Sequence, residues 1–137
     1  MAVELNKINS FVEDLANKKI NLGGNGLTVA LTNTAHTASW SKLSDLTEVS
    51  YTYCSDRKIT VTSSAQASGT YKLVLSDLTL TASGGSVGAF RYIYIYDDNS
   101  SDDSLCWYYD YGSSITLNDT DTFSLKFDGT NGVITIA

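Results

Sequence analysis

One stretch constrains the fold more than any other, the sequence FRYIYIY at residues 90–96. Successive side chains of an extended strand point to opposite faces, so Tyr92, Tyr94 and Tyr96 share one face. Arg91, Ile93 and Ile95 share the other. A strand with one face in water would alternate apolar and polar residues. We therefore expect this strand to lie centrally in a sheet and to be covered on both sides.

A second aromatic segment, residues 105–111, follows the first after an acidic loop at 97–104. Two strand-like segments joined by a loop rich in Asp, Asn and Ser predict a β-hairpin with a long connection. Most of the aromatic side chains of the chain lie in this hairpin. We expect these rings to supply the core and part of a contact surface.

A single helix is predicted ahead of the strands. Leu5, Ile8, Phe11 and Leu15 recur at helical spacing, which predicts a helix over 4–19 that ends before the glycine-rich turn at 21–26. A helix this short is marginal alone, so its apolar stripe must pack on something. The partner is either the protein's own sheet or a neighbouring subunit.

Short strand patterns separated by turns fill the rest of the chain. Besides the aromatic hairpin, strands are expected at 27–32, 48–53, 58–62, 71–75, 78–81, 122–127 and 133–136. One helix before eight to ten such strands predicts an all-β fold, an antiparallel sandwich or barrel. We expect a single domain over 1–137, with the sandwich or barrel over 27–136.

The charge balance argues against several classes of partner. The chain carries a net charge of −6, and its nine Lys and Arg residues are scattered. Nucleic acids and anionic membranes both require clustered basic side chains, so neither is an expected partner. No apolar run approaches the ~20 residues of a membrane-spanning helix. The N-terminus lacks the layout of a secretory signal, so we expect synthesis in the cytoplasm without export.

The cysteines and the histidine offer little chemistry. Cys54 and Cys106 are expected to be separate reduced thiols, because cytoplasmic synthesis disfavours a disulfide. A disulfide and a metal pair completed by His36 are the alternatives. His36 is the one histidine, and it lies in a polar loop with no nucleophile motif nearby, so we expect a surface histidine.

Enzyme and cofactor motifs are missing from the sequence. The glycines at 84, 85 and 88 precede no Lys-Ser/Thr pair, so they form no phosphate-binding loop. A glycosidase would need two facing carboxylates, and nothing singles out a pair among the fifteen Asp and Glu residues. We expect no enzymatic activity, no catalytic residues and no cofactor.

The acidic loop is a weak candidate for a cation site. Asp97, Asp98, Asp102 and Asp103 cluster there, and carboxylates are the ligands that Ca²⁺ prefers. The loop lacks the alternate-position ligands and the distal Glu of an EF-hand. We therefore expect a solvated loop, with weak Ca²⁺ binding as the alternative.

The helix stripe and the aromatic hairpin are the candidate contact surfaces. Large rings anchor protein interfaces because they provide much contact area at little entropic cost. The same rings stack on sugars in carbohydrate-binding sandwiches, and they also line ordinary cores. The predicted interface residues are Leu5, Ile8, Phe11, Val12, Tyr92, Tyr94, Tyr96, Trp107 and Tyr109.

Four segments together resemble a known family. They are LNKINSFVEDLANKKINLGGNGLTVALTNTA near the start, SSAQASGTYKLVLSDLTLTASGG, FRYIYIYDD, and WYYDYGSSITLNDTDTFSLKFDGTNGVITIA at the end. The chain is similar from Leu5 to Ala137 to small virion structural proteins of tailed bacteriophages. It departs from the family pattern near Trp107, where Ser104 and Cys106 replace a Gly- and Pro-containing segment, and near His36, where no Pro is found.

The resemblance implies a non-enzymatic part of the virion. Its simplest form is a decoration, or cement, protein that binds the major capsid protein on the outside of the head. Shell proteins meet at symmetry axes, so we expect a homo-oligomer, with a trimer favoured. The alternatives are a tail or head–tail component and a carbohydrate-binding module.

Overall fold

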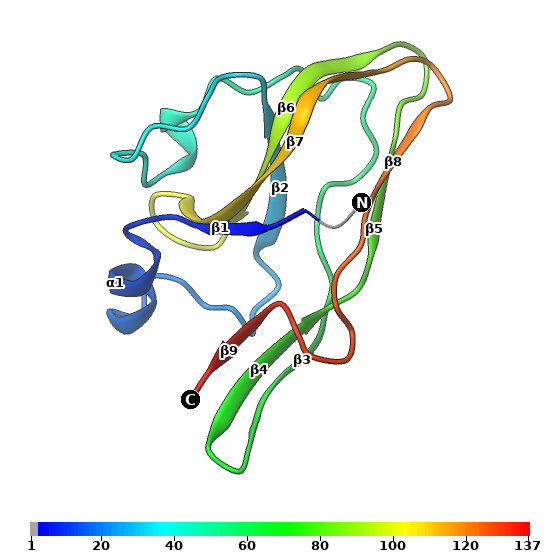
Figure 1. The fold of residues 1–137 in the computed structure, drawn as a ribbon. Helices are drawn as coiled ribbons and strands as arrows, with labels where there is room; N and C mark the ends of the chain where they lie inside the picture. Colours follow the sequence, from blue (N-terminus) through cyan, green and yellow to red (C-terminus); the bar gives the residue numbers. More distant parts are fainter. Residues whose placement is uncertain (1–2) are drawn as a thin grey trace.

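The computed structural model describes residues 3–137 (Figure 1). Strands make up 47% of the chain and helices 7%, and the sheets are antiparallel. This confirms the predicted all-β, sandwich-like fold with one short N-terminal helix. The elements are β1 (Leu5–Lys7), α1 (Phe11–Ala16), β2 (Leu27–Thr32), a 3-10 turn (Leu43–Asp45), β3 (Val61–Ala67), β4 (Thr70–Leu75), β5 (Leu78–Thr81), β6 (Val87–Asp97), β7 (Ser104–Leu117), β8 (Thr122–Leu125) and β9 (Ile134–Ile136).

The predicted aromatic hairpin is the centre of the molecule. Strands β6 and β7 pair antiparallel from Asp97 opposite Ser104 outwards, and they are the inner strands of a sheet with the order β1-β7-β6-β2. Tyr94 and Ile95 point to opposite faces of β6, and both are completely buried. The prediction of a central strand covered on both sides is therefore confirmed.

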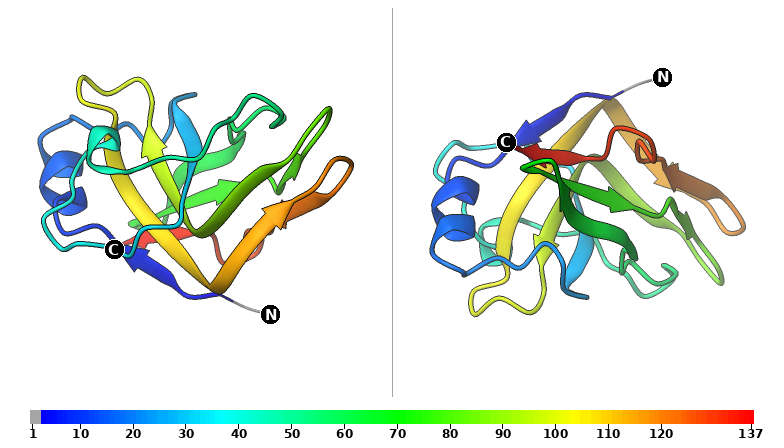
Figure 2. Two further views of the ribbon diagram at one scale, coloured as in Figure 1. Left: turned by 90° about the horizontal axis from the view of Figure 1, so that it is seen from above. Right: turned by 90° about the horizontal axis from the view of Figure 1, so that it is seen from below.

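The hairpin forms part of a longer ribbon that folds back on itself. A second sheet pairs β5 with β8, and a third has the order β3-β4-β9. Figure 1 shows the ribbon of β6 and β7 running to its far end, where it continues as β5 and β8 in the opposite direction. Figure 2 shows this folded-back arrangement from above and below, with the sheet of β6 and β7 as one layer and the sheet of β5 and β8 as part of the other. Phe90 of β6 meets Phe123 of β8 edge to face, with ring centroids 5.4 Å apart.

The predicted helix over 4–19 is wrong in its first half. Leu5–Lys7 forms strand β1 and pairs with β7, so that Lys7 lies opposite Trp107. The spacing of three residues between Leu5 and Ile8 is compatible with a helix. The backbone of this segment instead pairs with the edge of β7, so it becomes a strand. The helix runs only over Phe11–Ala16, and Phe11 is its buried residue.

The predicted strand at 48–53 is also wrong. This segment makes one isolated bridge, Glu48 opposite Thr32, and no continuous ladder. The Tyr51 hydroxyl instead accepts the backbone N–H of Leu31 at 2.8 Å, so a side chain takes the place of a backbone partner. The expected strand at 58–62 begins only at Val61, because residues 57–59 bond to the edge of β2.

Two smaller features complete the fold. Cys54 and Cys106 are free thiols, and burial raises the pKa of the Cys106 thiol. None of the helices within residues 3–137 combines the length and the apolar character needed to cross a membrane.

Candidate binding groove

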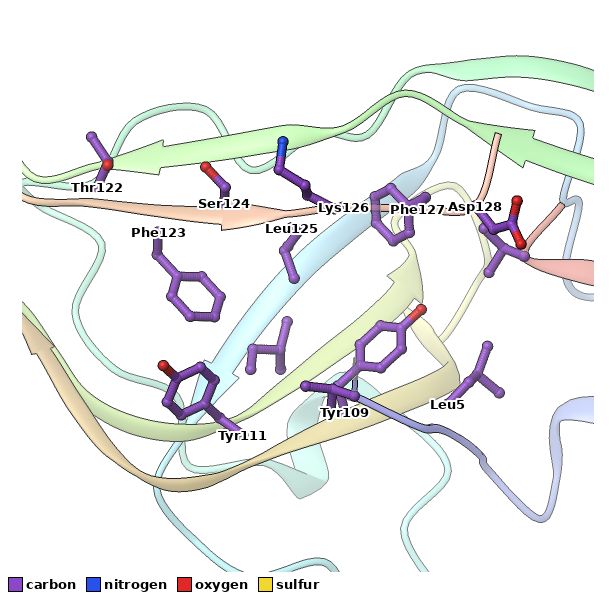
Figure 3. A pocket seen from close by; sticks show the side chains of 13 residues that line it. Leu5, Tyr109, Tyr111, Thr122, Phe123, Ser124, Leu125, Lys126, Phe127 and Asp128 are labelled. Carbon is purple, nitrogen blue, oxygen red and sulfur yellow. The ribbon is translucent and has the colours of Figure 1, made fainter. Parts of the chain in front are cut away.

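An open groove of about 670 Å³ lies between the two layers of the sandwich (Figure 3). One wall is the sheet of β1, β7 and β6. The other wall is β8 with the turn that follows it. Phe123, Tyr109 and Tyr111 are directed into this space in Figure 3, with Leu5 at one end. The groove is lined by residues 122–128 together with Val3, Leu5, Ile93, Tyr109, Tyr111 and Val133.

The alternation of β7 places its tyrosines in the groove. Trp107, Tyr109 and Tyr111 are two residues apart, so a regular strand presents all three on one face. Trp107 is completely buried, and its indole N–H donates to the Tyr109 hydroxyl at 3.1 Å. Tyr111 meets Phe123 of β8 with ring centroids 5.6 Å apart. One face of β7 therefore passes from closed core into open groove.

The turn at 128–132 shapes the end of the groove. The Asp128 carboxylate accepts the backbone N–H groups of Thr130 and Asn131, both at 2.9 Å. Gly132 has φ of +82°, and a Cβ at that position would lie 2.8 Å from the Leu73 carbonyl oxygen. Only glycine fits this turn, which returns the chain to β4 and sets Val133 against the groove.

The groove is neutral and apolar inside. Burial raises the pKa of Tyr109 to about 12, so its hydroxyl stays protonated at neutral pH. Hydrogen bonds from Asn131 and Thr130 lower the pKa of Asp128, which keeps this carboxylate ionised. Lys126 is exposed on the rim, and its Nζ lies 3.7 Å from the Asp77 carboxylate. The charged groups thus lie at the edge of the groove.

The side chains that line the groove can contact apolar groups. A general acid at neutral pH needs a raised carboxyl pKa, whereas that of Asp128, the carboxylate in the lining, is lowered. The Ser124 and Thr79 hydroxyls form a hydrogen bond of 3.1 Å, and no histidine or cysteine within residues 3–137 lines the groove. An apolar, aromatic lining of this kind is typical of sites that take apolar groups.

The predicted interface residues divide into two groups. Most lie in the protomer's own core, which corrects their assignment to a contact surface: Ile8, Phe11, Tyr92, Tyr94, Tyr96 and Trp107 are each at most 9% exposed. Phe11 packs edge to face on Trp107 at 6.2 Å. Val12 is 52% exposed, and Leu5 and Tyr109 line the groove. Only these three remain available to a partner.

The groove also contains residues that the sequence did not single out as contacts. Tyr111 is not among the predicted interface residues, and the pattern at 122–127 predicts only a strand, whose alternation places Phe123, Leu125 and Phe127 on one face. Leu125 is buried, but Phe123 and Phe127 are only partly covered, because they border the open groove in the part of the chain that the structure describes. Alternation identifies the apolar face of a strand, but it does not show whether that face is covered.

The acidic loop does not gather its carboxylates. Asp97 is 1% exposed and accepts the backbone N–H groups of Asn21 at 2.9 Å and Asn99 at 3.0 Å. Asp98 pairs with Lys58, and Asp102 pairs with Lys19. Within residues 3–137 no three His, Cys, Asp or Glu side chains are placed to hold a metal ion. The predicted weak site at Asp97, Asp98, Asp102 and Asp103 is therefore not assembled.

The lone histidine lies in an aromatic cluster that the sequence did not indicate. His36 Nδ1 is 2.8 Å from the Tyr94 hydroxyl, and its ring stacks on Tyr108 with centroids 4.4 Å apart. Trp40 meets His36 edge to face. His36 is half-buried rather than exposed, and burial lowers its pKa. This cluster holds the loop at 33–42 against the sheet face opposite the groove.

Comparison with known proteins adds no family to this description. No family model matches the chain, and the curated proteins and the solved structures to which we compared it gave no match.

Proposed function

We propose that the chain is a non-enzymatic virion protein of a tailed bacteriophage, and that it decorates the head by binding the outer lattice of the major capsid protein. The observation that carries this proposal is the open aromatic groove on a rigid β scaffold. A cement protein needs a stable framework and a surface that docks, and it needs no reacting group. The resemblance of the sequence to small virion proteins is the reason for proposing a phage head as the place where this surface docks.

The described surface suits a repeated outer lattice. The exposed strand β3, with the sequence VTSSAQA, is small, polar and uncharged. A net charge of −6 favours solubility at the high local concentration of a decorated shell. Each copy needs only modest affinity if copies are joined, because linked sites bind through effective concentration. We propose a homo-oligomer, and a trimer would match local threefold positions of a capsid.

The test is gold-labelled antibody against this protein on intact virions, viewed by electron microscopy. The proposal predicts label over the heads. Label confined to the tail or neck contradicts it in favour of a tail or head–tail component. Virions that lack the protein by mass spectrometry contradict both structural assignments.

A second candidate function rests on the cluster around His36. Trp40 and Tyr108 are partly exposed there and pack on one histidine, Trp40 edge to face and Tyr108 stacked, and their rings could contact the flat face of a sugar ring. Trp107 is completely buried, so a change in tryptophan fluorescence on adding glycan would report Trp40. A glycan response that disappears in Trp40→Phe supports a carbohydrate-binding module. Unchanged fluorescence across a glycan panel contradicts it.

A further inference from the structure

The groove follows the edge of β8 as well as its face. It touches residues 122–128 without a gap, including Ser124 and Lys126 between the apolar positions. Successive side chains of a strand point to opposite faces. Because the groove also touches the residues between the apolar positions, it borders the backbone of this segment as well as its inward side chains.

The hydrogen-bond pattern identifies the backbone groups on that edge. In an antiparallel pair, alternate residues bond to the neighbouring strand and the residues between them point away. The Ala82 N–H donates to the Asp121 carbonyl at 3.0 Å, and the Phe127 N–H donates to the Asp77 carboxylate at 2.8 Å. The odd-numbered residues of this segment thus face β5. The N–H and C=O groups of Ser124 and Lys126 face the groove.

Within residues 3–137, β8 pairs with β5 alone, and Ser124 and Lys126 take part in no further backbone hydrogen bond between elements. Natural edge strands are usually shielded by a charged side chain or a cover. Lys126 is such a charge, but Figure 3 shows its side chain directed away from the groove, and its Nζ lies toward Asp77. The edge of β8 is left open above an apolar space.

We propose that this groove receives an extended segment of a neighbouring virion protein, which adds a strand to β8 and inserts alternate apolar side chains between the two layers. This inference rests on the proposed function, because the virion role is the reason for expecting the segment to come from another virion protein. The guest strand would bond to Ser124 and Lys126, and its inward side chains would pack on Tyr109, Tyr111 and Phe127. Residues 122–128 can pair with a guest of about 20 Å in extended length.

The chemistry of the guest follows from the groove and from the charge of the chain. Addition of a strand to a sheet edge draws affinity from main-chain hydrogen bonds and specificity from alternate side chains. The guest should therefore carry large apolar residues at every second position. Because the chain has a net charge of −6 and Asp128 lies in the groove lining, Lys or Arg should flank those residues and Asp or Glu should not.

Strand β3 of a second copy would fit the groove poorly. The exposed strand β3 carries Thr, Ser, Ala and Gln, which would leave the apolar space unfilled. Pairing two copies also brings together two chains of the same net charge. A different protein with an alternately apolar segment avoids both costs.

The experiment measures amide hydrogen exchange by NMR on the isolated protein with and without a synthetic peptide. In the probe, Leu and Thr alternate as in Leu78–Thr81, the strand that already pairs with β8, and Lys stands at each end. A matched depsipeptide has ester bonds in place of the central amides, so it keeps the side chains and loses the N–H donors. A third peptide carries Ser in place of Leu.

The proposal predicts that the alternating peptide slows exchange at Ser124 and Lys126 by about tenfold or more, and leaves the amides of β3 unchanged. The ester and Ser peptides should protect these amides much less. Phe127→Ser should weaken the effect, while Tyr53→Ser, an exposed aromatic outside the groove, should not.

The proposal is overturned if no peptide protects Ser124 and Lys126, or if the ester form protects them equally. It is also overturned if protection appears without peptide as protein concentration rises, since the occupant would then be a second copy. The assay needs no virion, so its failure is distinct from that of the antibody test. Peptide binding by a protein absent from virions would refute the proposed function alone.

Discussion

At the scale of single residues, Asp97 and Asp98 are neighbours of the same type whose burial and hydrogen bonding differ. Asp97 is 1% exposed and accepts two backbone N–H groups, whereas Asp98 makes one exposed ion pair with Lys58 at 3.5 Å. A Cβ on Gly26 would overlap the Asp97 carboxylate, so glycine is required beside it. The loop of the central hairpin is therefore tied to the segment before β2 through Asp97.

Asp97→Ala should lower the free energy of unfolding by about 2 kcal/mol, because it removes the buried carboxylate that accepts the backbone N–H groups of Asn21 and Asn99. Asp98→Ala is the matched control and should change stability by at most about 1 kcal/mol, since surface ion pairs contribute little. Denaturant unfolding of both variants measures the difference. Equal losses in the two variants would show that Asp97 does not hold the loop.

The ion pair between Arg91 and Asp110 makes a second residue-scale prediction, on pH. Arg91 donates to both carboxylate oxygens, at 2.8 and 3.1 Å, and this lowers the pKa of Asp110. A carboxyl group with a lower pKa in the folded state stabilises the fold above its unfolded pKa of about 3.9. That contribution is lost as the pH falls through the folded-state pKa.

Asp110→Asn should therefore reduce stability at neutral pH, and its difference from the wild type should shrink as the pH falls below about 4. Glu4→Gln, which removes an exposed carboxylate that has no hydrogen bond among those found in residues 3–137, is the control. Thermal unfolding across this pH range provides the measurement. A difference that stays constant in acid would contradict the assignment.

At the scale of elements, the N-terminal helix tests whether its stripe is core or contact surface. Phe11 is 4% exposed against Trp107, and its neighbour Val12 is 52% exposed. Phe11→Asp should cost at least about 3 kcal/mol and unfold the isolated protomer under mild conditions. Val12→Asp should leave stability within about 0.5 kcal/mol. A folded Phe11→Asp protomer, by circular dichroism, would contradict intramolecular packing.

The elements that could be predicted from sequence are those whose structure follows from a pattern within their own residues, without a partner from elsewhere in the chain. The hairpin at 90–111 was predictable because its apolar groups occupy both faces, a pattern that only a central strand satisfies. The turn at 128–132 was predictable from its Asp and Gly residues. Strand β5 begins and ends where its Leu-Thr alternation does.

The remaining elements depend on partners distant in sequence. Leu5 and Ile8 fit helical spacing, but β7 offers this segment a strand partner, and so Leu5–Lys7 becomes β1. Tyr51 replaces a backbone partner with its hydroxyl, which no periodicity reveals. The groove itself depends on how the ribbon of β6 and β7 folds back as β5 and β8. Nothing in the residues at 122–127 indicates that one edge lacks a neighbour.

At the scale of the whole molecule, the groove is a place where the sandwich does not close. Phe90 of one layer packs on Phe123 of the other, and the space between the layers opens beside Phe123, Tyr109 and Tyr111. A strand from another protein would complete the packing and pair an open edge in one step. On our account this incomplete closure is what attaches the protein to its lattice.

The most direct test of this account is a cryo-electron microscopy reconstruction of the decorated head. We predict that the chain lies on the outer capsid surface, with an extended segment of a neighbouring virion protein paired along β8 and its apolar side chains between Tyr111 and Phe127. A chain that sits on the head with this groove open to solvent would contradict the account, and so would a chain found only on the tail.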